Sequence, residues 1–272
     1  MTSVGAVLAG AVQRLSTAGC DTPRLDAELL LAEALGARRA QVLICSRRRL
    51  DGVRARRFEA LLRRREAREP VAYILERKGF RHLELAVDRR VLVPRPETEL
   101  LVEAGLGLPR AAAAVDVGTG SGAVALALKH ERRDLRVSAT DASRGALAVA
   151  RANARRLGLE VSFHRADLLA AVPGRFDAVL ANLPYVADAE LTGLPPEVSE
   201  HEPRLALSGG RDGLDAIRGL VAQSAGAAFV ALEVGAGQAA AVARLLGTAG
   251  FATVETRRDL AGIERVVVGR RG

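Results

Sequence analysis

The spacing of hydrophobic residues changes near residue 70, and this change divides the sequence into two regions. In residues 1–70 the apolar positions recur at helical intervals, so only helices are predicted there. One helix is expected to begin at Thr22 and end at Gly36. A second, strongly basic helix is expected over Val53–Arg68, because Glu69-Pro70 disfavours its continuation.

From Ala111 onward, short apolar runs alternate with helical patterns. Seven runs predict strands, at Ala113–Val117, Arg136–Asp141, Val161–Arg165, Phe176–Asn182, Ala228–Glu233, Phe251–Arg257 and Glu264–Gly269. Helices such as Ser143–Leu157 fill the gaps, which indicates a mostly parallel sheet covered on both faces. Only the short connection Asp259–Gly262 joins the last two strands, so these should pair antiparallel.

The segment between the two regions has a different pattern. Leu83–Val87 and Val91–Val93 are interpreted as a β-hairpin around Asp88-Arg89. The sequence therefore predicts a helical domain at 1–70, a hairpin linker at 71–95 and an α/β domain at 96–272.

The net charge of +8 comes almost entirely from arginine. Ten arginines are expected to lie on one face of the helical region: Arg47, Arg48, Arg49, Arg54, Arg56, Arg57, Arg63, Arg64, Arg65 and Arg68. Such a face favours an acidic or nucleic-acid partner, although arginine-rich codon usage and a solvated surface would give the same charge. Aromatic residues make up only 3% of the chain, and the basic region lacks the aromatic side chains that stack on bases.

The cysteines and the N-terminus favour a cytoplasmic protein. Cys20 and Cys45 fit neither a metal site nor a disulfide framework. The stretch ending at Cys20 loosely resembles a lipoprotein cleavage site, but Gln13 and Arg14 interrupt it. No apolar segment reaches the length of a membrane span.

A glycine-rich loop, Asp116–Gly122 (DVGTGSG), follows the first predicted strand. Its glycines permit a sharp turn and a close approach to a ligand, and the N–H groups of the next helix suit a carboxylate such as that of a methionine moiety. Asp141 ends the second strand, where it can accept hydrogen bonds from ribose hydroxyls, and Asp167 follows the third strand, near an adenine. A tight turn without a ligand and a dinucleotide loop are the alternatives. Asp116 favours the methyl donor, because dinucleotide sites usually keep this strand apolar.

The fourth predicted strand ends in the tetrad Asn182–Tyr185 (NLPY). An amide nitrogen is a poor nucleophile, and the Asn182 side-chain oxygen and the Leu183 carbonyl can hold its two N–H groups for in-line attack. Pro184 keeps Leu183 extended, and the Tyr185 ring can stack on the amide plane. A simple strand-to-loop turn would also use Asn and Pro. It becomes the weaker interpretation because the glycine loop, Asp141 and the tetrad all fall at strand carboxyl ends.

Further motifs extend over nearly the whole chain. They are Glu69–Leu75 (EPVAYIL), Val93–Glu99 (VPRPETE), the glycine loop, the tetrad, Glu202–Leu207 (EPRLAL), Gly209–Asp215 (GGRDGLD), Asp259–Gly262 and Arg265–Val267. With these motifs the chain resembles the HemK/PrmC family of peptide chain release factor glutamine methyltransferases.

The resemblance implies an α/β class I methyltransferase fold. This fold has a Rossmann-like, mostly parallel seven-stranded sheet with an antiparallel last strand, and the family adds a small all-α N-terminal domain that recognises the release factor. The implied enzyme transfers methyl from S-adenosylmethionine to the glutamine nitrogen of a Gly-Gly-Gln motif, leaves S-adenosylhomocysteine and uses no metal.

The resemblance also assigns residues. The donor is expected to contact Gly118, Thr119, Gly120, Ser121, Gly122, Asp141, Asp167, Leu168 and Asn182. The glutamine is expected at Asn182, Leu183, Pro184 and Tyr185, and the mouth of the pocket at Arg95, Pro96, Glu97 and Thr98. The family tetrad is N-P-P-Y, but because Leu183 acts through its carbonyl, Leu183→Pro is predicted to leave activity unchanged or raise it. The sequence also departs from the family pattern at Glu76–Phe80. This departure affects only the prediction of where the hairpin begins.

Three alternatives remain. A nucleic-acid methyltransferase acting on adenine or guanine amino groups would share the tetrad, but the R-P-E-T-E segment and the lack of a target recognition domain disfavour it. An NAD-dependent oxidoreductase would leave the tetrad without a role, and a non-catalytic binding module would not need an intact loop. The expected partner is therefore a release factor, with no stable nucleic-acid partner and no membrane.

Overall fold

A computed structural model describes residues 3–44 and 46–272, so Cys45 lies outside the described residues. The chain forms two compact units. The helical unit contains the chain up to Arg77 together with Pro195–His201, and the sheet unit contains Lys78–Leu194 and Glu202–Gly272. Segment 195–201 thus belongs with the helical unit although it follows the tetrad in sequence. None of the described helices is long and apolar enough to cross a membrane.

The helical unit confirms that the first region folds only into helices. These are α1 (Val4–Thr17), α2 (Pro23–Leu35), α3 (Arg39–Ile44), α4 (Gly52–Glu66), α5 (Val71–Ile74) and, from the later segment, α9 (Pro196–Ser199). The Asp51 carboxylate caps α4 by accepting from the Arg54 N–H, and Gly36 ends α2 in the left-handed conformation. Leu15, Leu30 and Leu62 lie in its core.

An ion-pair network is buried inside the helical unit. The Arg65 Nε donates to Asp26 at 2.7 Å, and its Nη2 lies 2.7 Å from a Glu197 oxygen on α9. Arg68 donates to both oxygens of the same Glu197, at 2.6 and 2.5 Å. The prediction that Arg65 belongs to an exposed basic face is therefore wrong, because only 5% of Arg65 is exposed.

One strand of the predicted hairpin is confirmed, since Leu83–Ala86 lies within the predicted strand Leu83–Val87, but its partner is not Val91–Val93. Strand β1 (Arg77–Phe80) pairs with β2 (Leu83–Ala86). Val91–Val93 forms no strand, although a turn does bring the Val91 N–H to the Asp88 carbonyl. The apolar alternation at 91–93 reflects burial of Val91 and Val93 rather than strand pairing.

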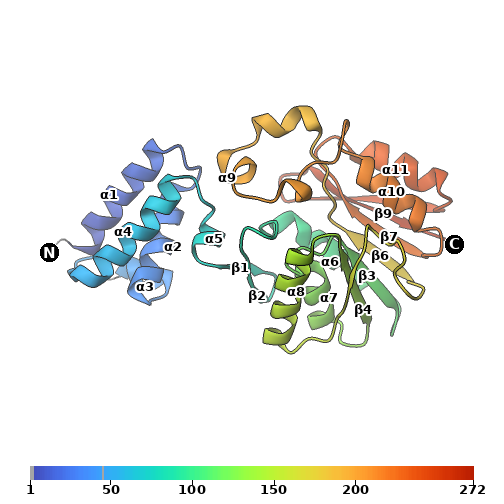
Figure 1. The fold of residues 1–272 in the computed structure, drawn as a ribbon, viewed down its shortest axis with the longest axis horizontal. Coiled ribbons are helices and arrows are strands. Elements are labelled where there is room, and N and C mark those ends of the chain that lie inside the picture. The colour runs from blue at the N-terminus through green and yellow to red at the C-terminus, as the bar shows by residue number, and fades with distance from the viewer. Residues whose placement is uncertain (1–2, 45) are drawn as a thin grey trace. The chain divides into compact units, whose positions relative to one another are not determined.

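The sheet has the order β5-β4-β3-β6-β7-β9-β8 (Figure 1). Its strands are β3 (Ala113–Val117), β4 (Arg136–Asp141), β5 (Ser162–Arg165), β6 (Ala178–Ala181), β7 (Phe229–Glu233), β8 (Thr253–Arg258) and β9 (Glu264–Arg270). The first five are parallel, and β9 runs antiparallel to both β7 and β8. The predicted mostly parallel sheet with an antiparallel last strand is confirmed.

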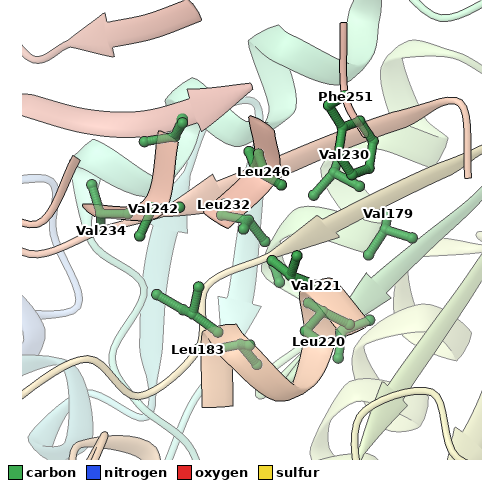
Figure 2. Packing of buried hydrophobic residues seen from close by; sticks show 14 of the residues in the cluster. Val179, Leu183, Leu220, Val221, Val230, Leu232, Val234, Val242, Leu246 and Phe251 are labelled. Atoms are coloured by element: carbon green, nitrogen blue, oxygen red, sulfur yellow. The ribbon is translucent and has the colours of Figure 1, made fainter. Parts of the chain in front are cut away.

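Helices cover both faces of this sheet (Figure 1). The elements around it are η1 (Pro96–Thr98), α6 (Glu99–Leu106), α7 (Ala123–Glu131), α8 (Arg144–Leu157), η2 (Asp188–Gly193), η3 (Arg204–Ala206), α10 (Asp215–Gln223) and α11 (Ala239–Thr248). Helices α10 and α11 pack a large apolar cluster against one face, and Figure 2 shows Leu246 of α11 near Leu232 of β7, with Leu220 of α10 in the same cluster. This packing fixes the strand carboxyl ends on which the candidate site is built.

Candidate active site

A cavity of about 460 Å³ lies within the sheet unit at the carboxyl ends of β3, β4 and β6. Twelve of the predicted site residues line it: Arg95, Thr98, Gly118, Thr119, Gly120, Ser121, Asp141, Asp167, Leu168, Asn182, Leu183 and Pro184. Pro96, Glu97, Gly122 and Tyr185 are not among the lining residues. The volume is within the range of pockets that enclose a small organic ligand.

Hydrogen bonds hold the glycine loop against the sheet. The buried Asp116 carboxylate accepts from the Thr119 hydroxyl at 2.6 Å and from the Ala125 N–H at 3.1 Å. Burial raises the pKa of Asp116 to about 6, although these hydrogen bonds oppose the rise. Gly118 and Gly120 have φ values of 73° and 56°, in the left-handed region that glycine adopts without strain.

Asp141 connects β4 to the same loop. One of its oxygens accepts from the Gly120 N–H at 2.9 Å, and the other accepts from the Ser143 N–H at 2.8 Å. Burial raises the pKa of Asp141. Each carboxylate oxygen can accept more than one hydrogen bond, so Asp141 keeps acceptor capacity for a pair of ligand hydroxyls.

The tetrad begins directly after β6. The Asn182 Nδ2 donates to the Thr98 hydroxyl at 3.1 Å, which joins the tetrad to the R-P-E-T-E segment. The Leu183 side chain is only 4% exposed and packs in the apolar cluster labelled in Figure 2. A Cβ on Gly118 would lie 3.2 Å from a Leu183 methyl carbon, so the loop and the tetrad are in close contact. Sequence reasoning missed this packing role, because it considered only the Leu183 carbonyl.

The G-G-R-D-G motif lies against the backbone of the tetrad. The Gly209 N–H donates to the Val186 carbonyl at 2.9 Å. A Cβ on Gly209 would lie 2.7 Å from the Pro184 carbonyl oxygen, and one on Gly213 only 2.2 Å from that of Tyr185. Glycine is therefore required at both positions, since any side chain would displace the tetrad.

Tyr185 is half-buried, and Glu202 is buried. Burial raises the pKa of Tyr185 to about 12, so its phenol stays neutral near pH 7. The Arg95 Nη2 donates to both oxygens of the buried Glu202 at 2.8 and 2.7 Å, which links the R-P-E-T-E and E-P-R-x-A-L segments.

Sequence reasoning missed Glu233, the last residue of β7. It is 2% exposed, and burial raises its pKa to about 7. Its position at a strand carboxyl end is the signal that would have found it, because the same rule found Asp141 and Asn182.

Comparisons with known proteins give the following matches. A model of the PrmC N-terminal domain matches residues 6–75, and a model of the methyltransferase small domain matches residues 96–194. The release factor glutamine methyltransferase of Rhodospirillum rubrum is 42% identical over 276 residues, which cover 98% of this chain and 85% of that protein. The enzyme of the same description from Cereibacter sphaeroides is 44% identical, with 97% and 96% covered.

Solved structures resemble the fold at much lower identity. A methyltransferase from Pyrococcus furiosus is 17% identical with a TM-score of 0.56 and covers 79% of this chain and 98% of its own. The hMettl16 catalytic domain, solved with a MAT2A 3'UTR hairpin, is 13% identical with a TM-score of 0.56 and covers 68% and 74%. At these identities the likeness confirms the predicted class I methyltransferase fold.

Proposed function

The chain belongs to the release factor glutamine methyltransferase family, and from this premise we propose that it methylates the glutamine side-chain nitrogen in the Gly-Gly-Gln motif of peptide chain release factors. The observation that carries the proposal is that Asn182–Pro184 of the tetrad and Gly118–Ser121 of the glycine loop line one cavity, in contact through Leu183 and Gly118. A transferable methyl group and a planar amide can therefore meet at the carboxyl ends of β3 and β6.

The residues of the cavity fit S-adenosylmethionine as the methyl donor. The left-handed glycines leave backbone exposed to a ligand, and the loop precedes the N-terminus of α7, which favours a carboxylate. Asp141 has the acceptor capacity that a ribose needs, and Asp167 and Leu168 line the same cavity. When bound, the donor supplies an electrophilic methyl group on a sulfonium.

The tetrad suits the amide nitrogen of glutamine. Because the Asn182 Nδ2 already donates to Thr98, the Asn182 oxygen is left to accept one N–H of the substrate. The Leu183 carbonyl would accept the other, so that the nitrogen is held in one orientation before transfer. The neutral Tyr185 ring would cover the amide plane and exclude water.

We assign recognition of the release factor to the helical unit, since the matched N-terminal family model covers it. Arg56 and Arg63 on α4 are exposed there and can meet acidic groups.

The test is methyl transfer from labelled S-adenosylmethionine to a purified release factor. Parallel reactions contain the factor with its motif Gln changed to Ala, ribosomal RNA, or DNA. Label on the unchanged factor alone is the expected result. Label on nucleic acid and none on the factor would replace this proposal by the nucleic-acid methyltransferase.

A further inference from the structure

Glu233 is unusual among the buried polar groups. Its Oε2 is the one buried side-chain nitrogen or oxygen within residues 3–44 and 46–272 that has no hydrogen-bond partner. A buried carboxylate with unused acceptors destabilises the fold, and a neutral residue would fit at lower cost. A stabilising role therefore does not explain a glutamate at this position.

The strand register brings Glu233 next to the tetrad. In the parallel pair β6–β7, Ala181 lies opposite Leu232, so the next step places Asn182 opposite Glu233. Thr98 connects the two side chains. Its hydroxyl accepts from the Asn182 Nδ2 at 3.1 Å, and its hydrogen bond to the Glu233 carboxylate favours the charged form of that group.

A hydroxyl has a single hydrogen to donate. If Thr98 donates it to the Glu233 carboxylate, Thr98 can only accept from Asn182. The Asn182 amide must then present its nitrogen to Thr98 and its oxygen to the other side.

We propose that Glu233 is a positioning residue for methyl transfer, which fixes the Asn182 side-chain oxygen as an acceptor for the substrate amide through the Thr98 hydroxyl. This inference rests on the proposed function and adds a residue outside the cavity, because Glu233 does not line it. Without the carboxylate, Thr98 could donate to the Asn182 oxygen instead. The Asn182 amide would then turn its nitrogen towards the nitrogen of the substrate, and two donors would face each other.

Protonation of Glu233 would release the same constraint. Burial raises the Glu233 pKa to about 7, the negative charge of Glu97 adds to the rise, and Arg265 and Arg95 oppose it. Tyr185 also feels the Glu233 charge but stays neutral in this range, because burial raises its pKa to about 12. The ionised form is the active one, so methyl transfer should fall as the pH drops through about 7.

The experiment uses the full chain with four substitutions: Glu233→Leu, Glu233→Gln, Thr98→Val and Thr98→Ser. kcat and KM for a release factor are measured from pH 5.5 to 8.5, and S-adenosylhomocysteine affinity is measured by calorimetry. Glu233→Leu and Thr98→Val should each lower kcat about tenfold at pH 8, the effect of one hydrogen bond, and leave the S-adenosylhomocysteine affinity within about twofold. Thr98→Ser keeps the hydroxyl and should restore most of the activity that Thr98→Val loses.

Glu233→Gln separates positioning from folding. It removes the titrating group but keeps the size of the side chain, so the acidic fall near pH 7 should disappear while thermal stability is retained or increased. Glu131→Gln, which removes a carboxylate of the same unit outside the cavity, should keep the wild-type kcat, KM and pH profile.

A wild-type kcat in both Glu233→Leu and Thr98→Val would overturn the inference. A Glu233→Gln variant whose activity still fell as the pH dropped through about 7 would overturn it as well. If the wild-type chain itself does not methylate the factor, the proposed function fails. If the wild type is active and the variants match it, only the role of Glu233 fails.

Discussion

Buried acids are paired with arginines inside the helical unit, whereas two buried acids at the strand carboxyl ends of the sheet unit are not. In the helical unit the buried Arg65 is paired with Asp26 and Glu197, and hydrogen bonds from Arg68 and Arg65 lower the pKa of Glu197 to about 2 despite its burial. At the strand carboxyl ends of the sheet unit, Asp116 and Glu233 have raised pKa values of about 6 and 7, since burial dominates and no arginine is within ion-pair distance among the described residues.

The difference indicates what each set of charges is for. Paired charges compensate one another and stabilise a particular packing. Buried acids without a cation cost stability, and such groups concentrate where a ligand or a reaction uses them. The helical unit should therefore respond to substitution in its stability, and the sheet site should respond in binding and turnover.

The largest effect is expected from breaking the buried network. Arg65→Met leaves Asp26 without its arginine and removes one partner of Glu197, so the free energy of unfolding should fall by about 3–5 kcal/mol. Urea denaturation followed by circular dichroism measures this. Arg14→Met is the control, because its pairs with Glu59 and Glu66 are 28–39% exposed and should contribute less than about 1 kcal/mol. If both variants lost the same free energy of unfolding, the buried pairs of Arg65 would be no more important for stability than the exposed pairs of Arg14.

The tetrad should show the opposite response. Asn182→Ala removes the acceptor proposed for the substrate amide and should lower kcat about 100-fold, the usual effect of losing one polar contact to the reacting group. The thermal midpoint should stay near the wild-type value. A variant that kept the wild-type kcat would show that Asn182 does not orient the substrate.

A third substitution tests donor binding in the sheet unit. Asp141→Ala removes the acceptor proposed for the ribose and should weaken S-adenosylhomocysteine binding about ten- to hundredfold by calorimetry. Asp134→Ala, on the exposed loop before β4, should bind as the wild type does. Equal S-adenosylhomocysteine affinity in both variants would show that Asp141 does not bind the donor.

Leu183 bears on both activity and stability, because its carbonyl is proposed to bind the substrate and its side chain packs in the core. Leu183→Pro keeps the carbonyl, so activity should be unchanged or higher. The loss of part of a buried side chain should lower the free energy of unfolding by about 1 kcal/mol. A large loss of activity with little loss of stability would contradict the backbone-acceptor role.

The smallest effect is expected on the surface of the helical unit. Arg56→Glu combined with Arg63→Glu should raise KM for the release factor several-fold at low salt, and added salt should reduce the difference. The same pair of reversals at Arg110 and Arg175, exposed in the sheet unit, is the control. An unchanged KM in the α4 variant would assign factor recognition to another surface.

Local patterns predicted most of the fold. The strands β3 and β4 agree with the predicted runs to the residue, because β3 is mostly apolar and buried, and in β4 the buried Val137 and Ala139 alternate with polar residues. One strand of the hairpin was misplaced at 91–93, since Val91 and Val93 alternate as a strand does but are buried outside any strand. The attachment of residues 195–201 to the helical unit depends on pairing between residues more than 120 positions apart, which no local pattern encodes.

The candidate site was predictable where function uses short motifs. The glycine loop, Asp141 and Asn182 were identified from position and residue type, and they do line one cavity. Glu233, the core packing of Leu183 and the burial of Arg65 were not identified. Each of these depends on which neighbours surround a side chain, and that information comes only from the tertiary fold.

The discontinuous helical unit has a consequence for how the protein is made. During synthesis the first 77 residues emerge long before Glu197. More than a hundred further residues must therefore be added before Arg65 and Arg68 can form their ion pairs with that carboxylate. Domains usually fold in order as they leave the ribosome. Here the first unit to emerge can complete its packing only after most of the second has been translated, so a nascent chain stalled before residue 195 should leave the first unit open to proteolysis.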